Sequence, residues 1–199
     1  CEKIQVVATD QHEGYAASIR EHCPRATHVL DRFHLMQNFE EAVNETRKEL
    51  HQEQAPGSEL KRLSRGKYRF LFVKKANRRT EEDKQHIDDV LKENQAFVKL
   101  ELIKERMLSF FDQQEEGEAK KIFEQIGDWI WQCGFKPLMA WYGEFEKGWN
   151  TIRNYFRYRV TSALSEGHNN VIKMLKRRAF GYRNMEYFRL KIMQVCGYL

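Results

Sequence analysis

The hydrophobic period of the chain changes near Asp31, and this change most constrains the fold. Before it, Lys3–Asp10 has the apolar run of a buried strand, residues 11–22 have helical spacing, and Ala26–Asp31 forms a second apolar run. Two neighbouring strands joined by one helix predict a strand-helix-strand unit with a right-handed crossover.

After Asp31, apolar residues recur at helical spacing almost without interruption. With only 3 Pro and 11 Gly and 32% charged residues, the composition favours helices and argues against sandwiches, barrels and disorder. The expected helices cover roughly residues 32–51, 59–76, 80–112, 116–132 and 136–160. The sequence therefore predicts a small α/β part followed by a long helical part.

The positive charge is clustered. The net charge is +5, but Lys61–Arg79 holds nine Lys or Arg and no acid, and Lys173–Lys191 holds seven with one acid, Glu186. Clustered cations attract phosphates, so a nucleic-acid partner is expected.

The four cysteines are too far apart for a C-x-x-C zinc or redox motif, which favours reduced thiols in the cytoplasm. No apolar run approaches the roughly 20 residues that span a bilayer, so no membrane is expected. The chain starts directly on a strand, from which we expect the protein to extend upstream.

Asp10 stands where the first strand ends. In open α/β sheets, ligand-binding and catalytic groups lie at the carboxyl ends of strands, so its carboxylate is a candidate site group. The alternative is that Asp10 caps the helix expected over residues 11–22.

Asp31 and His34 repeat this arrangement at the second strand, within the motif DRFH. An Asp and a His at this spacing could supply an oxygen and a nitrogen to a metal. The alternative is structural, with Asp31 as the N-cap of the long helix and His34 bonded to a nearby acceptor.

Glu166 lies near the start of a late helix, on a polar stripe with Asn170, Lys173 and Arg177. A carboxylate in such a place could bind a metal while its neighbours hold phosphates. An ordinary solvated Glu is the alternative. The apolar face of this helix is expected to consist of Leu164, Val171 and Leu175. The apolar face of the last helix is expected to consist of Tyr187, Leu190 and Val195.

Three blocks, VVATDQHEGY, the P-x-A strand running into DRFH, and SEGHNNVIKMLKRRAFGYRN, together resemble the C-terminal catalytic region of bacterial insertion-sequence transposases of the ISL-three family. The resemblance covers about residues 4–50 and 160–197. It implies an α/β chain of predominantly helical content, with a partial RNase H-like fold of two or so strands interrupted by a large helical insertion. The implied division is a catalytic core over residues 1–40 and 161–199, with the insertion over residues 41–160.

The resemblance also implies roles for single residues. Asp10 matches the second aspartate of the DDE triad and Glu166 its glutamate, both catalytic and metal-binding, while Asp31 and His34 match a supporting element. The first aspartate has no candidate in this chain and is expected upstream, so the chain alone should hold metal weakly and be inactive. His168 stands where a small or apolar residue is more usual, and its role stays open.

The implied reaction uses two Mg²⁺ or Mn²⁺ ions about 4 Å apart to hydrolyse a phosphodiester at the transposon end and then to transfer the strand into target DNA. A homodimer in the synaptic complex and a place in the bacterial cytoplasm at the nucleoid are expected. The expected DNA contacts are Asn170, Lys173, Lys176, Arg177 and Arg178.

Two alternatives stay open at this stage. A non-enzymatic, helical nucleic-acid-binding or regulatory protein would account for the basic clusters, although it leaves the two strand-end aspartates without a role. An RNase H-like nuclease that cleaves without strand transfer would use the same carboxylates.

Overall fold

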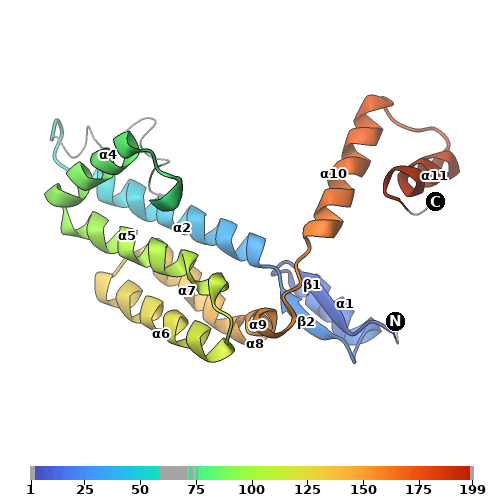
Figure 1. The fold of residues 1–199 in the computed structure, drawn as a ribbon, viewed down its shortest axis with the longest axis horizontal. Coiled ribbons are helices and arrows are strands. Elements are labelled where there is room, and N and C mark those ends of the chain that lie inside the picture. The colour runs from blue at the N-terminus through green and yellow to red at the C-terminus, as the bar shows by residue number, and fades with distance from the viewer. Residues whose placement is uncertain (1–2, 59–70, 72–73, 75, 198–199) are drawn as a thin grey trace.

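The computed structural model describes residues 3–58, 71, 74 and 76–197. This part of the chain is mostly helical, with one two-stranded parallel sheet (Figure 1). In chain order, its elements are β1 Val6–Thr9, α1 Glu13–His22, β2 Thr27–Leu30, α2 Arg32–Gln52, the 3-10 turn η2 Ala76–Arg78, α4 Glu81–Glu93, α5 Gln95–Leu108, the 3-10 turn η3 Phe110–Asp112, α6 Glu116–Cys133, α7 Lys136–Lys147, α8 Trp149–Ile152, α9 Asn154–Tyr158, α10 Ala163–Arg178 and α11 Met185–Val195.

The predicted strand-helix-strand unit is present. β1 and β2 pair in parallel, with Val6 opposite Thr27 and Thr9 opposite Leu30, and α1 connects them. Both strands are shorter than expected. Because β1 and β2 run parallel, their carboxyl ends lie at the same edge of the sheet.

Helices α2 to α9 form a helical block with one apolar core (Figure 1). α2 packs against α7, and α5 packs against α6. Aromatic rings fill much of the interior, with Phe110 in edge contact with Phe145 and Phe123 stacked on Trp149. Val29 of β2 is fully buried in the same core, so the sheet and the block share one interior.

Hydrogen bonds from α9 also hold the block on the sheet. The Asn154 side chain donates to the backbone oxygen of His28 at 2.8 Å, and Thr27 donates to the Tyr158 hydroxyl at 3.4 Å. Arg32 at the start of α2 donates to the Tyr155 hydroxyl at 2.9 Å. The end of the block therefore lies directly beside β2.

Several predicted helices are divided. The helix expected over residues 80–112 breaks at Asn94, whose backbone is extended (φ −152°) and whose side chain caps α5 by accepting from the Ala96 N–H. The helix expected over residues 136–160 is divided at Gly148 and Arg153 into α7, α8 and α9. The helix expected over residues 59–76 lies largely outside the described residues.

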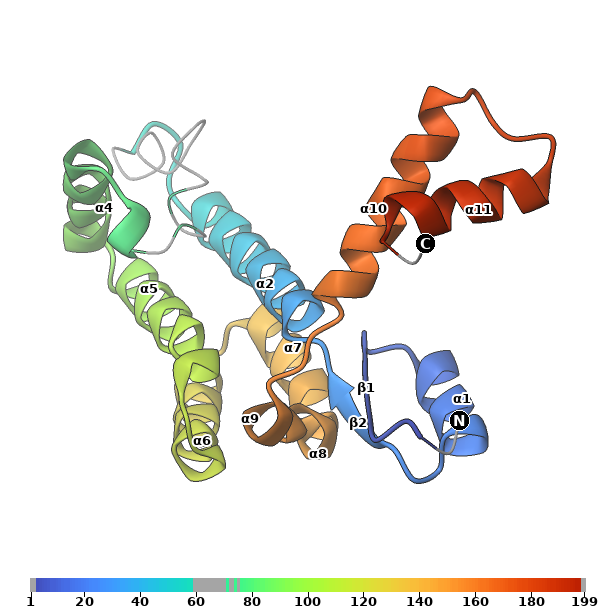
Figure 2. The same ribbon diagram turned by 45° about the vertical axis from the view of Figure 1, so that its right-hand side comes forward.

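α10 and α11 form an arm that stands apart from the helical block (Figures 1 and 2). Among the described residues, Leu175 is the one buried member of α10, and α11 has none. The predicted apolar faces are mostly exposed, since the residues with accessible side chains include Leu164, Tyr187, Leu190 and Val195. Periodicity identifies an apolar face, but it does not show what covers that face.

In the part of the chain that the structure describes, no helix is both long and apolar enough to cross a membrane. Cys23, Cys133 and Cys196 are free thiols, as the sequence predicts for these three.

Candidate active site

A hollow of about 390 Å³ lies where the end of β1, the start of α2 and the first turns of α10 meet. Figure 2 shows α10 rising from this end of the sheet beside α2. The hollow brings together residues from both ends of the sequence, and its lining consists of Ala8, Thr9, Asp10, Tyr15, His34, Ser162, Ser165, Glu166, Asn169, Asn170 and Lys173. We call it the Asp10–Glu166 pocket.

Asp10 directly follows the last residue of β1, as predicted. The alternative that it caps α1 is wrong, because His12 is the N-cap and its Nδ1 accepts from the Gly14 N–H at 3.1 Å. The Oδ1 atom of Asp10 is buried and has no hydrogen-bond partner among the described residues. A buried carboxylate oxygen without a partner is costly in a folded protein, which points to a cation or another donor at this place.

Asp31 is the N-cap of α2 and is only 1% exposed. Its Oδ1 accepts from the Phe33 N–H at 3.3 Å, and its Oδ2 accepts a hydrogen bond from the Ser162 hydroxyl. The imidazole of His34 lines the pocket, and its Nδ1 lies 3.5 Å from Asp31 Oδ2 without hydrogen-bond geometry. The N-cap alternative for Asp31 is thus confirmed, and the same residue lies beside the pocket.

Glu166 lies in the first turn of α10 and is exposed. Glu166, Asn170 and Lys173 of the predicted polar stripe line the pocket. The cations further along α10 lie outside the pocket lining, on exposed positions of the last turn, and they are Lys176, Arg177 and Arg178. His168, whose role the resemblance leaves open, is half-buried and outside the lining.

Besides Ala8 and Thr9 of β1, sequence reasoning missed four lining residues: Tyr15, Ser162, Ser165 and Asn169. Three of them lie within the blocks that carry the family resemblance, where Tyr15 ends VVATDQHEGY, Ser165 starts SEGHNNVIK and Asn169 lies inside it. Ser162 carries no such signal, because its partner Asp31 is 131 positions away.

The pocket offers hard oxygen donors from two carboxylates, hydroxyls and side-chain amides, which suit Mg²⁺ or Mn²⁺. Within the residues that the structure describes, no group of three His, Cys, Asp or Glu side chains comes close enough to hold a metal ion. The donor set and the unpartnered Asp10 oxygen fit part of a divalent-cation site that needs a further ligand.

His28 lies beside this pocket, with its Nε2 2.7 Å from the Thr9 hydroxyl oxygen. Burial, and secondarily the charge of Arg20, lower the pKa of His28 below its ordinary value. Burial thus favours the neutral imidazole at this place beside Thr9.

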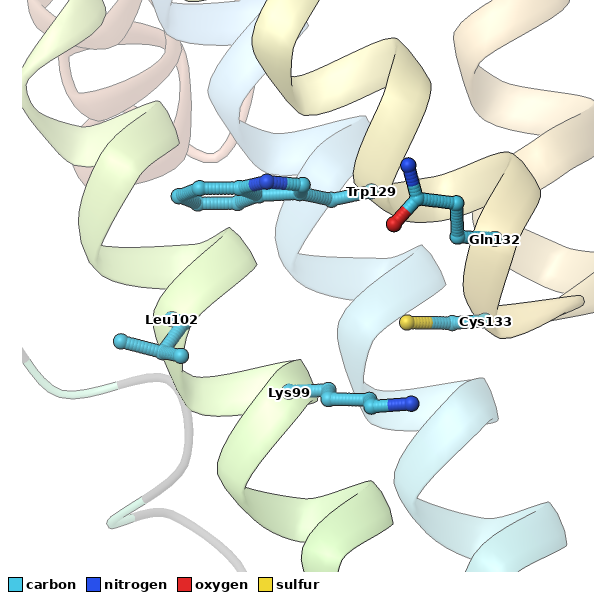
Figure 3. A pocket seen from close by; sticks show the side chains of 5 residues that line it. All are labelled: Lys99, Leu102, Trp129, Gln132 and Cys133. Carbon is cyan, nitrogen blue, oxygen red and sulfur yellow. The ribbon is translucent and has the colours of Figure 1, made fainter.

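Two other candidate features lack this chemistry. A hollow of about 210 Å³ between α5 and α6 has no carboxylate in its lining of Lys99, Leu102, Trp129, Gln132 and Cys133 (Figure 3). The basic run Lys61–Arg79 lies largely outside the described residues. Two of its described cations are already paired, Lys74 with Asp83 at 2.6 Å and Arg79 with Glu101 at 2.6 Å.

Comparison with known proteins gives a consistent assignment. Residues 1–192 match the model of the DDE_Tnp_ISL3 family, described as transposase. The transposase for insertion sequence element IS1001 of Bordetella parapertussis is 25% identical over 192 residues, which make up 96% of this chain and 47% of that protein. The chain thus spans about half the length of this relative. No solved structure matches.

Proposed function

Because the chain belongs to the ISL3 (ISL-three) family of DDE transposases, we propose that it carries the later part of a catalytic site that cuts DNA at transposon ends and joins them to target DNA. The observation that carries this proposal is the Asp10–Glu166 pocket, which unites two acidic residues 156 positions apart. The parallel β1–β2 pair with an acidic residue at its carboxyl end supports an RNase H-like core, with the helical block as an insertion.

In this proposal, Asp10 and Glu166 hold divalent cations, Mg²⁺ or Mn²⁺. Such ions would supply charge stabilisation to the attacking and leaving oxygens of a displacement at phosphorus. Asp10 directly follows the end of β1, whereas Glu166 comes from the arm. The chain's own contribution is therefore to fix the two carboxylates in one hollow from two separate elements.

The remaining lining residues suit a phosphodiester backbone. Lys173 supplies a positive charge, and Asn169 and Asn170 supply amide donors, all on the face of α10 that lines the pocket. The exposed cations in the last turn of α10 extend this positive surface away from the site. We propose that this side of α10 follows the DNA backbone without reading sequence, because Lys and Arg contact phosphates.

Metal binding tests the site directly. In Mn²⁺ titrations of this chain followed by electron paramagnetic resonance, Asp10→Asn and Glu166→Gln should each weaken binding about tenfold or more, because each removes a negatively charged ligand. Asp88→Asn, an exposed change on α4 with the same charge difference, is the control. Mn²⁺ affinity that is equal in all four proteins would contradict the site.

Cleavage tests the reaction. In the complete transposase, Glu166→Ala should abolish cutting of transposon ends while DNA binding is retained. A Glu166→Ala protein that still cuts would refute the catalytic role. Cleavage without joining, by the unmodified protein under the same conditions, would instead favour the nuclease alternative, which uses the same carboxylates.

DNA binding tests the basic surface. Charge reversal of Lys176 and Arg177 to Glu should weaken affinity and reduce the slope of log K against log salt, by about 0.9 for each duplex phosphate that the protein no longer neutralises. Reversal of Lys84 and Lys92, both exposed on α4, changes the net charge equally and is the control. Affinity and slope that respond equally to both pairs would argue against a specific contact by α10.

A further inference from the structure

We propose that Ser162 is a positioning residue of the Asp10–Glu166 pocket. Its hydroxyl is bonded to the buried Asp31 and thereby holds the start of α10, and with it the Glu166 carboxylate, at the end of the sheet. The role of this contact in metal binding rests on the proposed function, but the hydrogen bond between Ser162 and Asp31 can be tested separately.

Ser162 occupies the N-cap position of α10 but does not cap the helix with its side chain. A Ser at this position usually accepts a hydrogen bond from the second or third backbone N–H of its helix. Here the hydroxyl donates instead to Asp31 Oδ2, across 131 positions of sequence. The neighbouring Thr161 hydroxyl accepts the local bond from the Ala163 N–H, at 3.4 Å. The Ser162 side chain is thus used for a tertiary contact.

Asp31 is a fixed partner for this contact. It lies at the junction of β2 and α2, is 1% exposed, and has its other oxygen occupied by the Phe33 N–H. A buried carboxylate needs hydrogen-bond donors, and a bond to a charged acceptor is stronger than one between neutral groups. Removal of the Ser162 hydroxyl would leave Asp31 Oδ2 beside His34 Nδ1, which lies 3.5 Å away without hydrogen-bond geometry.

The link continues directly to Glu166. The backbone oxygen of Ser162 accepts from the Glu166 N–H at 2.9 Å, which closes the first turn of α10. Two hydrogen bonds therefore connect Asp31 to the residue that carries the second carboxylate. Since Leu175 is the one buried residue described in α10, packing holds this helix weakly, and the link has a correspondingly larger share in its placement.

The first test measures the metal site. Mn²⁺ titrations of this chain should show that Ser162→Ala weakens binding about tenfold or more, as substitutions behind metal ligands commonly do. Ser162→Thr keeps the hydroxyl and should restore binding. Thr161→Ala removes a neighbouring hydroxyl with a local bond and should leave binding near that of the unmodified chain. Equal affinity in Ser162→Ala and the unmodified chain, or an equal loss in Thr161→Ala, would overturn the proposal.

The second test needs no metal. Amide hydrogen exchange of metal-free chain should be about tenfold faster over residues 163–170 in Ser162→Ala, because a bond to a buried charge is lost, and near normal in Ser162→Thr. Unchanged exchange in Ser162→Ala would refute the link. If the unmodified chain bound no Mn²⁺ and exchange still rose as expected, the metal site would fail and the link between Asp31 and α10 would stand.

Discussion

Gly127, in the interior of α6, lies directly under the ring of Tyr142 from α7. A methyl group placed on Gly127 would stand 2.4 Å from both Cζ and the hydroxyl oxygen of Tyr142. Ordinary contacts of a Cβ atom begin near 3.4 Å, so the ring would have to move by about 1 Å. Tyr142 is buried, stacks on Phe123 at 4.9 Å and donates to the Phe123 backbone oxygen at 3.3 Å, so it has little room to move.

The expected cost of Gly127→Ala follows from these contacts. Overpacking costs about 1–3 kcal/mol, and the shifted ring also loses stacking and a hydrogen bond worth about 1 kcal/mol each. The better helix propensity of Ala returns about 1 kcal/mol. The net destabilisation is about 3 kcal/mol, which for a chain of this size lowers Tm by about 6–12 °C.

Gly143→Ala is the matched control, because Gly143 lies inside α7 and an added methyl group would meet nothing within 4 Å. This change should raise the free energy of unfolding by about 0.5–1 kcal/mol. Thermal and urea unfolding followed by circular dichroism measure both. In a Tyr142→Leu background, Gly127→Ala should cost less than in the unmodified chain. A Gly127→Ala chain as stable as Gly143→Ala would refute the reasoning.

Three further outcomes are expected. Because burial lowers the pKa of His28, the unfolded chain binds a proton at this residue more readily than the folded chain does. The free energy of unfolding should therefore fall as the pH drops below 6.5. His28→Gln should reduce that fall, which urea midpoints between about pH 7.5 and 5.5 would measure. Lys104→Met should cost about 1.5–3 kcal/mol, because it removes the hydrogen bond from the buried Lys104 ammonium to Glu101 at 2.9 Å, although Arg79 still pairs with Glu101. Lys121→Met, at an exposed pair, should change the urea midpoint little. Burial raises the pKa of Tyr142 to about 12. In absorbance titrations at alkaline pH, Tyr142→Phe should therefore show one phenol fewer than the unmodified chain near pH 12, and the two chains should not differ near pH 10.

The sequence predicted what depends on neighbouring residues. The strand before Asp10, the N-cap at Asp31 and the end of α6 at Gly134 all follow from local chemistry, and Gly134 adopts the left-handed backbone (φ 68°) expected after a helix. The break at Asn94 was missed because the helical period continues on both sides of it. The local signal for this break is Asn94 itself, since Asn is a common N-cap residue.

Long-range contacts limited the rest. His12 rather than Asp10 caps α1, and only the folded backbone shows which of two neighbouring polar side chains reaches the helix. Ser162 reads as a local cap in sequence, yet its partner lies at the other end of the chain. Grouping of Asp10 with Glu166 came from a family resemblance, because no local pattern relates residues so far apart.

The chain leaves the sheet at Asp31 and returns at Ser162, and these two residues touch. The segment between these two residues, which contains the helical block, therefore begins and ends at one place beside the sheet. A change in the length of this segment far from the sheet should leave Asp31 and Ser162 in contact. Changes next to the sheet should be tolerated less well, because the part of the helical block that lies beside β2 buries the Val29 side chain. Relatives should accordingly vary in length around the turn after α2 and should keep α8 and α9. A folded domain inserted at Pro56–Gly57 should be tolerated, whereas the same insertion at Gly148 should not.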